Sequence, residues 1–121
     1  MRVAQCVVVM SEELLNWRAA LASVAYAEQE YGKKLRSFIA NERDCAEYVA
    51  TWIRQGKNAE AVEKVHAIKL MATEFGAKRL ANAAFSLEMA IKAGADTAAS
   101  LNHFDSVLMD TLLAMSTYLA S

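Results

Sequence analysis

Apolar residues recur every three or four positions along most of the chain, the spacing that places them on one face of a helix. Short polar segments separate these stripes, so the pattern predicts a succession of amphipathic helices. Ser11, Asn41 and Asn58 each precede a stripe and are expected to act as N-caps, because their side chains accept hydrogen bonds from free helical N–H groups. The predicted helices run from Ser11 to about Val24, through Tyr31 to about Asn41, from there to Gln55, from Asn58 to Phe75, through Leu80 to Ile91, and from about Thr97 to Leu119.

The helix-breaking residues support the same division of the chain. There is no proline, and the four glycines are Gly32, Gly56, Gly76 and Gly94. The last three lie between stripes, where glycine readily ends a helix. Short connections between helices of similar length make sequence neighbours antiparallel, so we expect an all-α, antiparallel up-down bundle. Residues 11–121 are predicted to form this single domain, and residues 1–10 a weakly ordered or docked leader.

Composition limits the environment and the partners. A chain of 121 residues, 55% of them hydrophobic, is long enough to bury a core without disulfides or metals. Apolar runs such as 7–10 are far shorter than the roughly 20 residues that span a membrane. A formal net charge of −1 gives no electrostatic reason to bind nucleic acid. We expect a cytoplasmic, monomeric protein that binds neither nucleic acid nor membranes.

Neither cysteine indicates metal or thiol chemistry. Cys6 and Cys45 lack CxxC pairing and metal-ligand spacing, and each lies among apolar residues, so both are expected to be buried free thiols. The chain also lacks the Glu-x-x-His ligand sets of metal-containing helical bundles. The tryptophans, tyrosines and methionines fall mostly on the stripes, which favours core packing over a cofactor site. We expect no bound cofactor or metal.

Of the two histidines, His66 lies where an imidazole is both shielded and accessible. It is about 100° around its helix from Val65, which belongs to the apolar stripe, and Lys69 follows on the same flank. A nucleophile needs such a position, reachable by a partner and close to a group that can orient it. The stripe consists of Ala61, Val65, Ile68, Ala72 and Phe75.

An ordinary explanation stands beside this one. A histidine three residues before a lysine is common on helix surfaces, and the pair alone predicts no function. His103, in the last predicted helix, is interpreted as a surface or core histidine without a chemical role. The wider sequence around His66 favours chemistry over the ordinary explanation.

This wider stretch resembles the signature of the histidine-containing phosphotransfer (HPt) family. That signature has a histidine, any residue, a leucine-like residue, a lysine and a glycine, followed by a small residue two places on. A Gly-Ala pair comes at the end of the helix, and a leucine and a Leu-Glu pair lie downstream. The order and lengths of the helices extend the resemblance loosely over residues 14–119. The residues that match the signature are His66, Ile68, Lys69, Gly76, Ala77, Leu80, Leu87 and Glu88.

The resemblance implies a four-helix bundle with an additional N-terminal helix. In HPt domains a histidine on an exposed face accepts a phosphoryl group from the aspartate of one receiver domain and passes it to the aspartate of another, a role that falls here to His66. Lys69 would offset charge on the phosphoryl oxygens. The implied partners are receiver domains of response regulators or hybrid sensor histidine kinases, which carry the magnesium. The chain has neither a Walker loop nor a kinase glycine-rich loop, so we expect no nucleotide binding.

At two positions, Glu88 and Leu70, the sequence allows more than one interpretation. Glu88 either faces His66 and accepts its remaining N–H, or pairs with Lys69, or is a solvated charge. HPt domains usually have glycine where Leu70 stands, and a side chain four residues after His66 covers the surface over it. Either the partner has a matching hollow, or the domain is a degenerate module that binds receivers without efficient transfer. The residues expected to line the partner surface are Val62, Leu70, Thr73 and Gly76.

Overall fold

The computed structural model describes residues 15–18, 20 and 28–120, and within these ranges it contains helices and turns but no strand. Trp17, Arg18 and Ala20 are helical, in agreement with the first predicted helix. The rest of that helix and the leader predicted over residues 1–10 lie outside the described residues. The described helices are α3 (Glu28–Glu42), α4 (Cys45–Arg54), α5 (Asn58–Phe75), α6 (Lys78–Lys92) and α7 (Ala98–Ala120).

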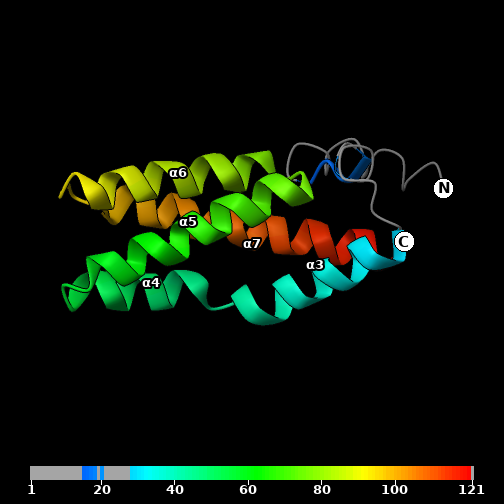
Figure 1. Ribbon diagram of the computed structural model, residues 1–121, viewed down its shortest axis with the longest axis horizontal. Coiled ribbons are helices and arrows are strands. Elements are labelled where there is room, and N and C mark those ends of the chain that lie inside the picture. The colour runs from blue at the N-terminus through cyan, green and yellow to red at the C-terminus, as the bar shows by residue number, and fades with distance from the viewer. Residues whose placement is uncertain (1–14, 19, 21–27, 121) are drawn as a thin grey trace.

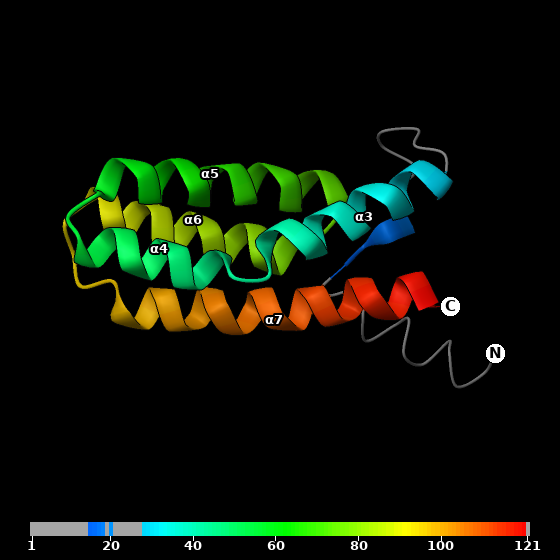
Figure 2. The same cartoon turned by 90° about the horizontal axis from the view of Figure 1, so that it is seen from below.

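These helices pack as a bundle (Figures 1 and 2). α3 and α4 follow one another along one side and together form one bent helix, with the bend at residues 43–44. α5 runs back beside α4, α6 returns beside α5, and α7 runs opposite to α6. The expectation of an all-α bundle is therefore confirmed.

The inward faces of the helices form one continuous core. The stripe predicted for α5, from Ala61 to Phe75, is buried throughout, and so is the stripe from Leu80 to Ile91 on α6. Burying a leucine- or phenylalanine-sized side chain stabilises the fold by roughly 1.5–3 kcal/mol, so these stripes determine which face of each helix turns inward. Residues on the flanks of the stripes, His66 among them, are consequently held at the edge of the core.

The turn between α5 and α6 depends on Gly76. This residue has a left-handed φ of 83°, and the N–H of Ala77 donates to the carbonyl of Ala72 (2.8 Å), which closes the end of α5. The Gly76 carbonyl accepts a hydrogen bond from the N–H of Asn16 (2.7 Å). A Cβ at Gly76 would collide with the Asn16 carbonyl oxygen. Glycine is therefore required both by the backbone conformation and by the close approach of the N-terminal segment.

Two of the predicted N-caps are wrong. Asn41 lies within the last turn of α3, where its side chain donates to Ser37 Oγ (3.2 Å), and Asp44 is the N-cap of α4. Asn58 is the first residue of α5, and Lys57 precedes it as the N-cap. Neither cap residue makes a side-chain capping hydrogen bond. The packing of the apolar faces, which contributes most of a helix's stability in a folded protein, decides these two boundaries instead.

The expectation that the large apolar residues pack in the core is wrong for several of them. Tyr48 is 57% exposed, and Met89 and Met109 are 48% and 41% exposed. Tyr48 lies roughly 100° around α4 from the centre of its buried face, too far to reach the core. Trp17 and Trp52 do pack against the core, as predicted.

Candidate functional site

The sequence-predicted site residues lie along the contact between α5 and α6, the most extensive contact between any two described helices. The buried stripes of the two helices face each other, so the flank of α5 that carries His66 and Lys69 lies beside the flank of α6 that carries Glu88. Residues far apart in the sequence are thereby held on a rigid scaffold. Such a scaffold fixes side-chain positions better than a loop does.

His66 is accessible and also has a defined partner. Its side chain is 46% exposed, and its Nδ1 lies 3.2 and 3.3 Å from the two carboxylate oxygens of Glu88. An ionised carboxylate accepts hydrogen bonds but donates none, so this contact places a hydrogen on Nδ1. In the neutral ring, the lone pair then remains on Nε2, on the side of the imidazole away from Glu88. An imidazole in this state has one oriented nitrogen and one nitrogen free to act as a nucleophile.

Glu88 is buried at the centre of this cluster, with a residue exposure of only 3%. Besides His66, it contacts two lysines: Lys92 Nζ lies 3.0 Å from Oε2 and Lys69 Nζ lies 3.4 Å from Oε1. The suggestion that Glu88 is a solvated charge is therefore wrong. The other two suggestions, a partner for His66 and a partner for Lys69, are both confirmed and hold at once.

The electrostatics of the cluster keep Glu88 ionised. Burial by itself raises the pKa of the Glu88 carboxyl, but hydrogen bonds from Lys92, His66 and Lys69 outweigh burial, so the pKa is lowered. A buried charge is tolerated only when it is paired and hydrogen-bonded, and both oxygens of Glu88 meet that condition. We name Glu88, His66, Lys69 and Lys92 the Glu88 cluster.

Two residues of this region were missed by the sequence reasoning. Lys92 follows Glu88 by four residues, a spacing that favours ion pairs on one helix and that was visible in the sequence. The ammonium of Lys69 lies over the Phe85 ring, with Nζ 5.3 Å from the ring centroid. This cation–π contact forms only because α5 packs on α6, so neither helix alone predicts it. Lys92 thus adds a second ammonium to Glu88, and Phe85 holds the first, that of Lys69, beside the same carboxylate.

Exposed apolar side chains lie on the same two helices as the Glu88 cluster. Leu70 on α5 is 56% exposed and Phe85 on α6 is 50% exposed, and Met89 follows Phe85 one turn later. Leu70 is therefore on the outer surface one turn after His66, as predicted from its position. Exposed apolar groups gathered around a polar centre are typical of a surface that meets another protein.

The other residues predicted for the partner surface differ in position. Val62 is half-buried and packs against the core. The Thr73 side chain is exposed, but its hydroxyl donates to the carbonyl of Lys69 (2.9 Å) within α5. Gly76 ends α5 about 15 Å along the helix axis from His66 by helical rise, so it shapes the turn and does not contact the imidazole.

The second histidine and the cysteines differ in their exposure. His103 is exposed on α7. Cys45 is buried, as predicted, and burial together with the charge of Glu42 raises the pKa of its thiol to about 12. Cys6 lies outside the described residues. Among those described, no group of three or more histidine, cysteine or acidic side chains is placed to hold a metal ion, and no helix is long and apolar enough to cross a membrane.

Comparison with known proteins adds no relative: no protein-family model matches the sequence, and neither a curated protein nor a solved structure matches it. The function of the protein is therefore inferred from the residues of the Glu88 cluster and their geometry.

Proposed function

We propose that this protein is a phosphorelay intermediary of the HPt type in two-component signal transduction. His66 accepts a phosphoryl group from the aspartyl phosphate of one receiver domain and passes it to the aspartate of another. The observation that carries the proposal is an exposed imidazole whose Nδ1 bonds a buried carboxylate, with two lysines on the same carboxylate. This is the environment expected for a histidine nucleophile with one nitrogen oriented and the other open to a partner.

The geometry suits a reversible transfer. The Nε2 lone pair of His66 forms a bond to phosphorus while the bond from phosphorus to the aspartate oxygen breaks, and the aspartate leaves as a carboxylate. The phosphorylated ring keeps its Nδ1 proton and becomes positively charged, and the adjacent Glu88 carboxylate stabilises that charge. In the second transfer the carboxylate of another receiver attacks phosphorus, and the neutral imidazole leaves. The proton stays on Nδ1 throughout, so no external base is needed.

The lysines have a part in the same scheme. Lys69 and Lys92 each carry a positive charge that Glu88 offsets in the resting state. A phosphoryl group on Nε2 brings negative charge to the same region, which these ammonium groups attract. The exposed apolar residues Leu70, Phe85 and Met89 offer a receiver domain an apolar contact area around the reacting atom.

The proposal extends to the finer architecture and setting. The bent α3–α4 helix, α5, α6 and α7 correspond to the four helices of an HPt bundle, and the helical residues 17, 18 and 20 to the additional N-terminal helix. The partners are receiver domains or hybrid sensor histidine kinases. The protein acts as a cytoplasmic, monomeric phosphocarrier, with no cofactor and no kinase activity of its own.

Transfer from a labelled receiver tests the proposal directly. A receiver domain carrying radioactive aspartyl phosphate is mixed with the protein, and the label on the protein is followed over time and tested for acid lability. We expect acid-labile label on wild type, none on His66→Gln, and full label on His103→Gln, which removes the exposed histidine of α7 as a matched control. Full labelling of His66→Gln would show that the assignment is wrong.

A second function has one observation in its favour. Leu70 is 56% exposed one turn after His66, where it occupies surface that a receiver must approach. We therefore consider a degenerate HPt-like module that binds receivers without efficient transfer. A Leu70→Gly variant that accepts phosphate many times faster than wild type, with unchanged receiver binding, supports this alternative. Efficient transfer by wild type contradicts it.

A further inference from the structure

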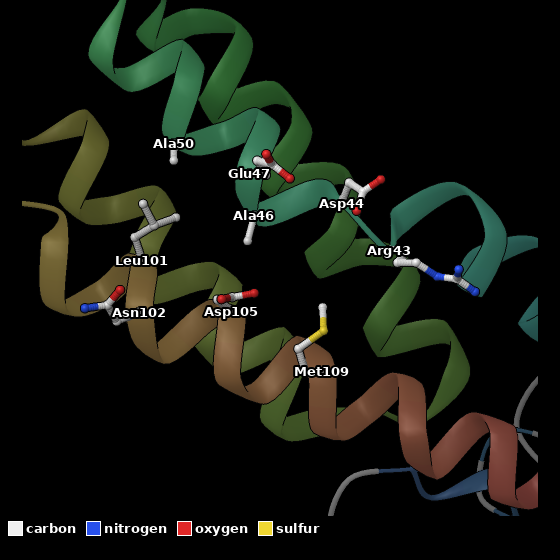
Figure 3. Close-up of a pocket in the computed structure, with 9 residues that line it drawn as sticks. All are labelled: Arg43, Asp44, Ala46, Glu47, Ala50, Leu101, Asn102, Asp105 and Met109. Carbon is white, nitrogen blue, oxygen red and sulfur yellow. The ribbon is translucent and has the colours of Figure 1, made fainter.

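A groove lies between α4 and α7, on the side of the bundle away from the contact between α5 and α6 (Figure 3). Its volume is about 370 Å³. Ala46 and Ala50 of α4 point toward α7, and Leu101 and Met109 of α7 point toward α4. The small side chains on α4 leave the space, and α4 and α7 pack together far less extensively than α5 and α6 do.

The rim of this groove is acidic. Asp44 and Glu47 line it from the start of α4, and Asp105 lines it from α7, against a single basic lining residue, Arg43. Within the described part of the chain, none of these three carboxylates takes part in an ion pair or a side-chain hydrogen bond. Arg43 at the rim and the N-terminal end of α4 beside Asp44 and Glu47 offset only part of these three negative charges.

We propose that this groove, which we name the α4–α7 groove, binds a basic amphipathic segment of a partner protein. Lysine and arginine place their aliphatic stems on apolar surface while their charged ends reach polar groups. The floor formed by Leu101 and Met109 suits the stems, and the carboxylates at the rim suit the ammonium or guanidinium groups. Beyond the groove, Leu113 continues this apolar row of α7 one turn after Met109 and is 69% exposed, so the segment lies along α7.

Charge favours a basic segment over the other possible occupants of the groove, which are nucleic acids, anionic membranes, the N-terminal residues of this chain and a second copy. The acidic rim repels the phosphates of nucleic acids and anionic membranes. The N-terminal residues 1–14 contain one basic residue, Arg2, and two acidic ones, so they do not complement the rim. A second copy would have to present one of its basic surfaces, such as that around Lys69 and Lys92, to the acidic rim. Such a contact joins two different surfaces, so it builds rings or open chains and not a two-fold symmetric dimer.

The groove and the Glu88 cluster lie on different helix pairs, so both surfaces are available at once. A partner held in the groove leaves His66 uncovered. Such a tether raises the effective concentration of whatever domain the partner carries near His66, which accelerates their encounter without a new contact at the imidazole. This consequence depends on the proposed phosphotransfer function, whereas binding in the groove does not.

Titration of the full chain with a labelled helical peptide of leucine and lysine tests the groove. Fluorescence anisotropy reports binding, and circular dichroism checks that each variant is folded. We expect the peptide to bind wild type and to bind Asp105→Lys at least about tenfold more weakly. Asp110→Lys is the matched control, because it makes the same charge change at an exposed position of α7 that does not line the groove, and it should bind nearly as wild type does.

Three outcomes would overturn the proposal. Equal weakening by Asp105→Lys and Asp110→Lys would mean attraction by overall charge. Binding of a peptide with glutamate in place of lysine would mean that the rim does not select its ligand. Concentration-dependent self-association of wild type that Asp105→Lys abolishes would make a second copy the occupant. His66→Gln should retain peptide binding, so failure of the phosphotransfer proposal and failure of this one are distinguishable.

Discussion

Helix α5 forms an ion pair with a buried glutamate on each of its two flanks, and the two pairs differ in one respect. On the flank toward α3, Lys64 Nζ lies 2.6 Å from Oε1 of Glu42, which is 5% exposed. On the flank toward α6, Lys69 contacts Glu88, which is buried to a similar degree. Only Glu88 also contacts an exposed histidine.

The comparison shows what separates a structural ion pair from a candidate reaction site. A buried lysine–glutamate pair is a common way to satisfy two charges at a helix contact, and by itself it indicates no chemistry. Glu88 carries two lysines and an imidazole, more donors than one carboxylate needs for burial. The additional donor, the His66 imidazole, is the group that can react, and the Glu88 carboxylate fixes its orientation.

Removal of each glutamate gives the largest expected difference between the two flanks. Glu88→Ala should slow phosphoryl transfer by about 100-fold, because the imidazole loses the group that orients it and stabilises its charge. Glu88→Gln should recover part of this loss, since its amide oxygen still accepts the Nδ1 hydrogen. Glu42→Ala should lower thermal stability but leave the transfer rate unchanged. Equal loss of transfer in both alanine variants would remove the distinction between the flanks.

The two turns that flank α5 allow the same comparison for stability. Gly76 leads to α6 and Gly56 precedes α5 in the turn after α4, and both have positive φ, 83° and 74°. Alanine at Gly56 meets no atom within 4 Å, so it should cost only the left-handed conformation, about 1 kcal/mol of unfolding free energy. Alanine at Gly76 also collides with the Asn16 carbonyl, so we expect a loss of more than about 2 kcal/mol. Denaturant titration measures both, and equal losses would mean that the approach of Asn16 has no energetic weight.

The sequence predicts the parts of this molecule that depend on periodicity and on local backbone geometry. The stripe on α5 places five residues in the core and His66 at its edge, and Gly76 ends the helix as expected. The caps were predicted less well. Asn41 and Asn58 are good capping residues by type, but the helix boundaries follow the tertiary packing of α3, α4 and α5.

The candidate site was only partly predictable for a related reason. The spacing of His66 and Lys69 on one flank can be read from one helix, so both were found. The contacts of Glu88 depend on the rotation and register of α6 against α5. Periodicity alone does not decide whether Glu88 is a partner for His66 or Lys69 or a solvated charge. Phe85 and Met89 look like core residues by composition, and only the packed structure shows both exposed on α6, with Phe85 against the Lys69 ammonium.

Acidification should reduce the contribution of Glu88 to stability. Folding lowers the pKa of this carboxyl, because the donors from Lys92, His66 and Lys69 outweigh its burial. Its stabilisation is therefore complete above the ordinary glutamate pKa of about 4.3 and is lost as pH falls through the lower pKa of the folded state. The difference in unfolding free energy between wild type and Glu88→Gln should shrink in that range. A difference that grows on acidification would contradict the lowered pKa.

The lysines give the smallest and most selective test of the two flanks. Lys92 is 52% exposed, and exposed ion pairs contribute little, so Lys92→Ala should slow transfer only about two- to fivefold. Lys69→Ala should slow it more, because Lys69 is 23% exposed and contacts both Glu88 and the Phe85 ring. Lys64→Ala removes an ammonium from the same helix on the opposite flank and should leave the transfer rate unchanged. If all three variants slowed transfer equally, the lysines would act through the overall charge of α5, and the Glu88 cluster would have no special place in the reaction.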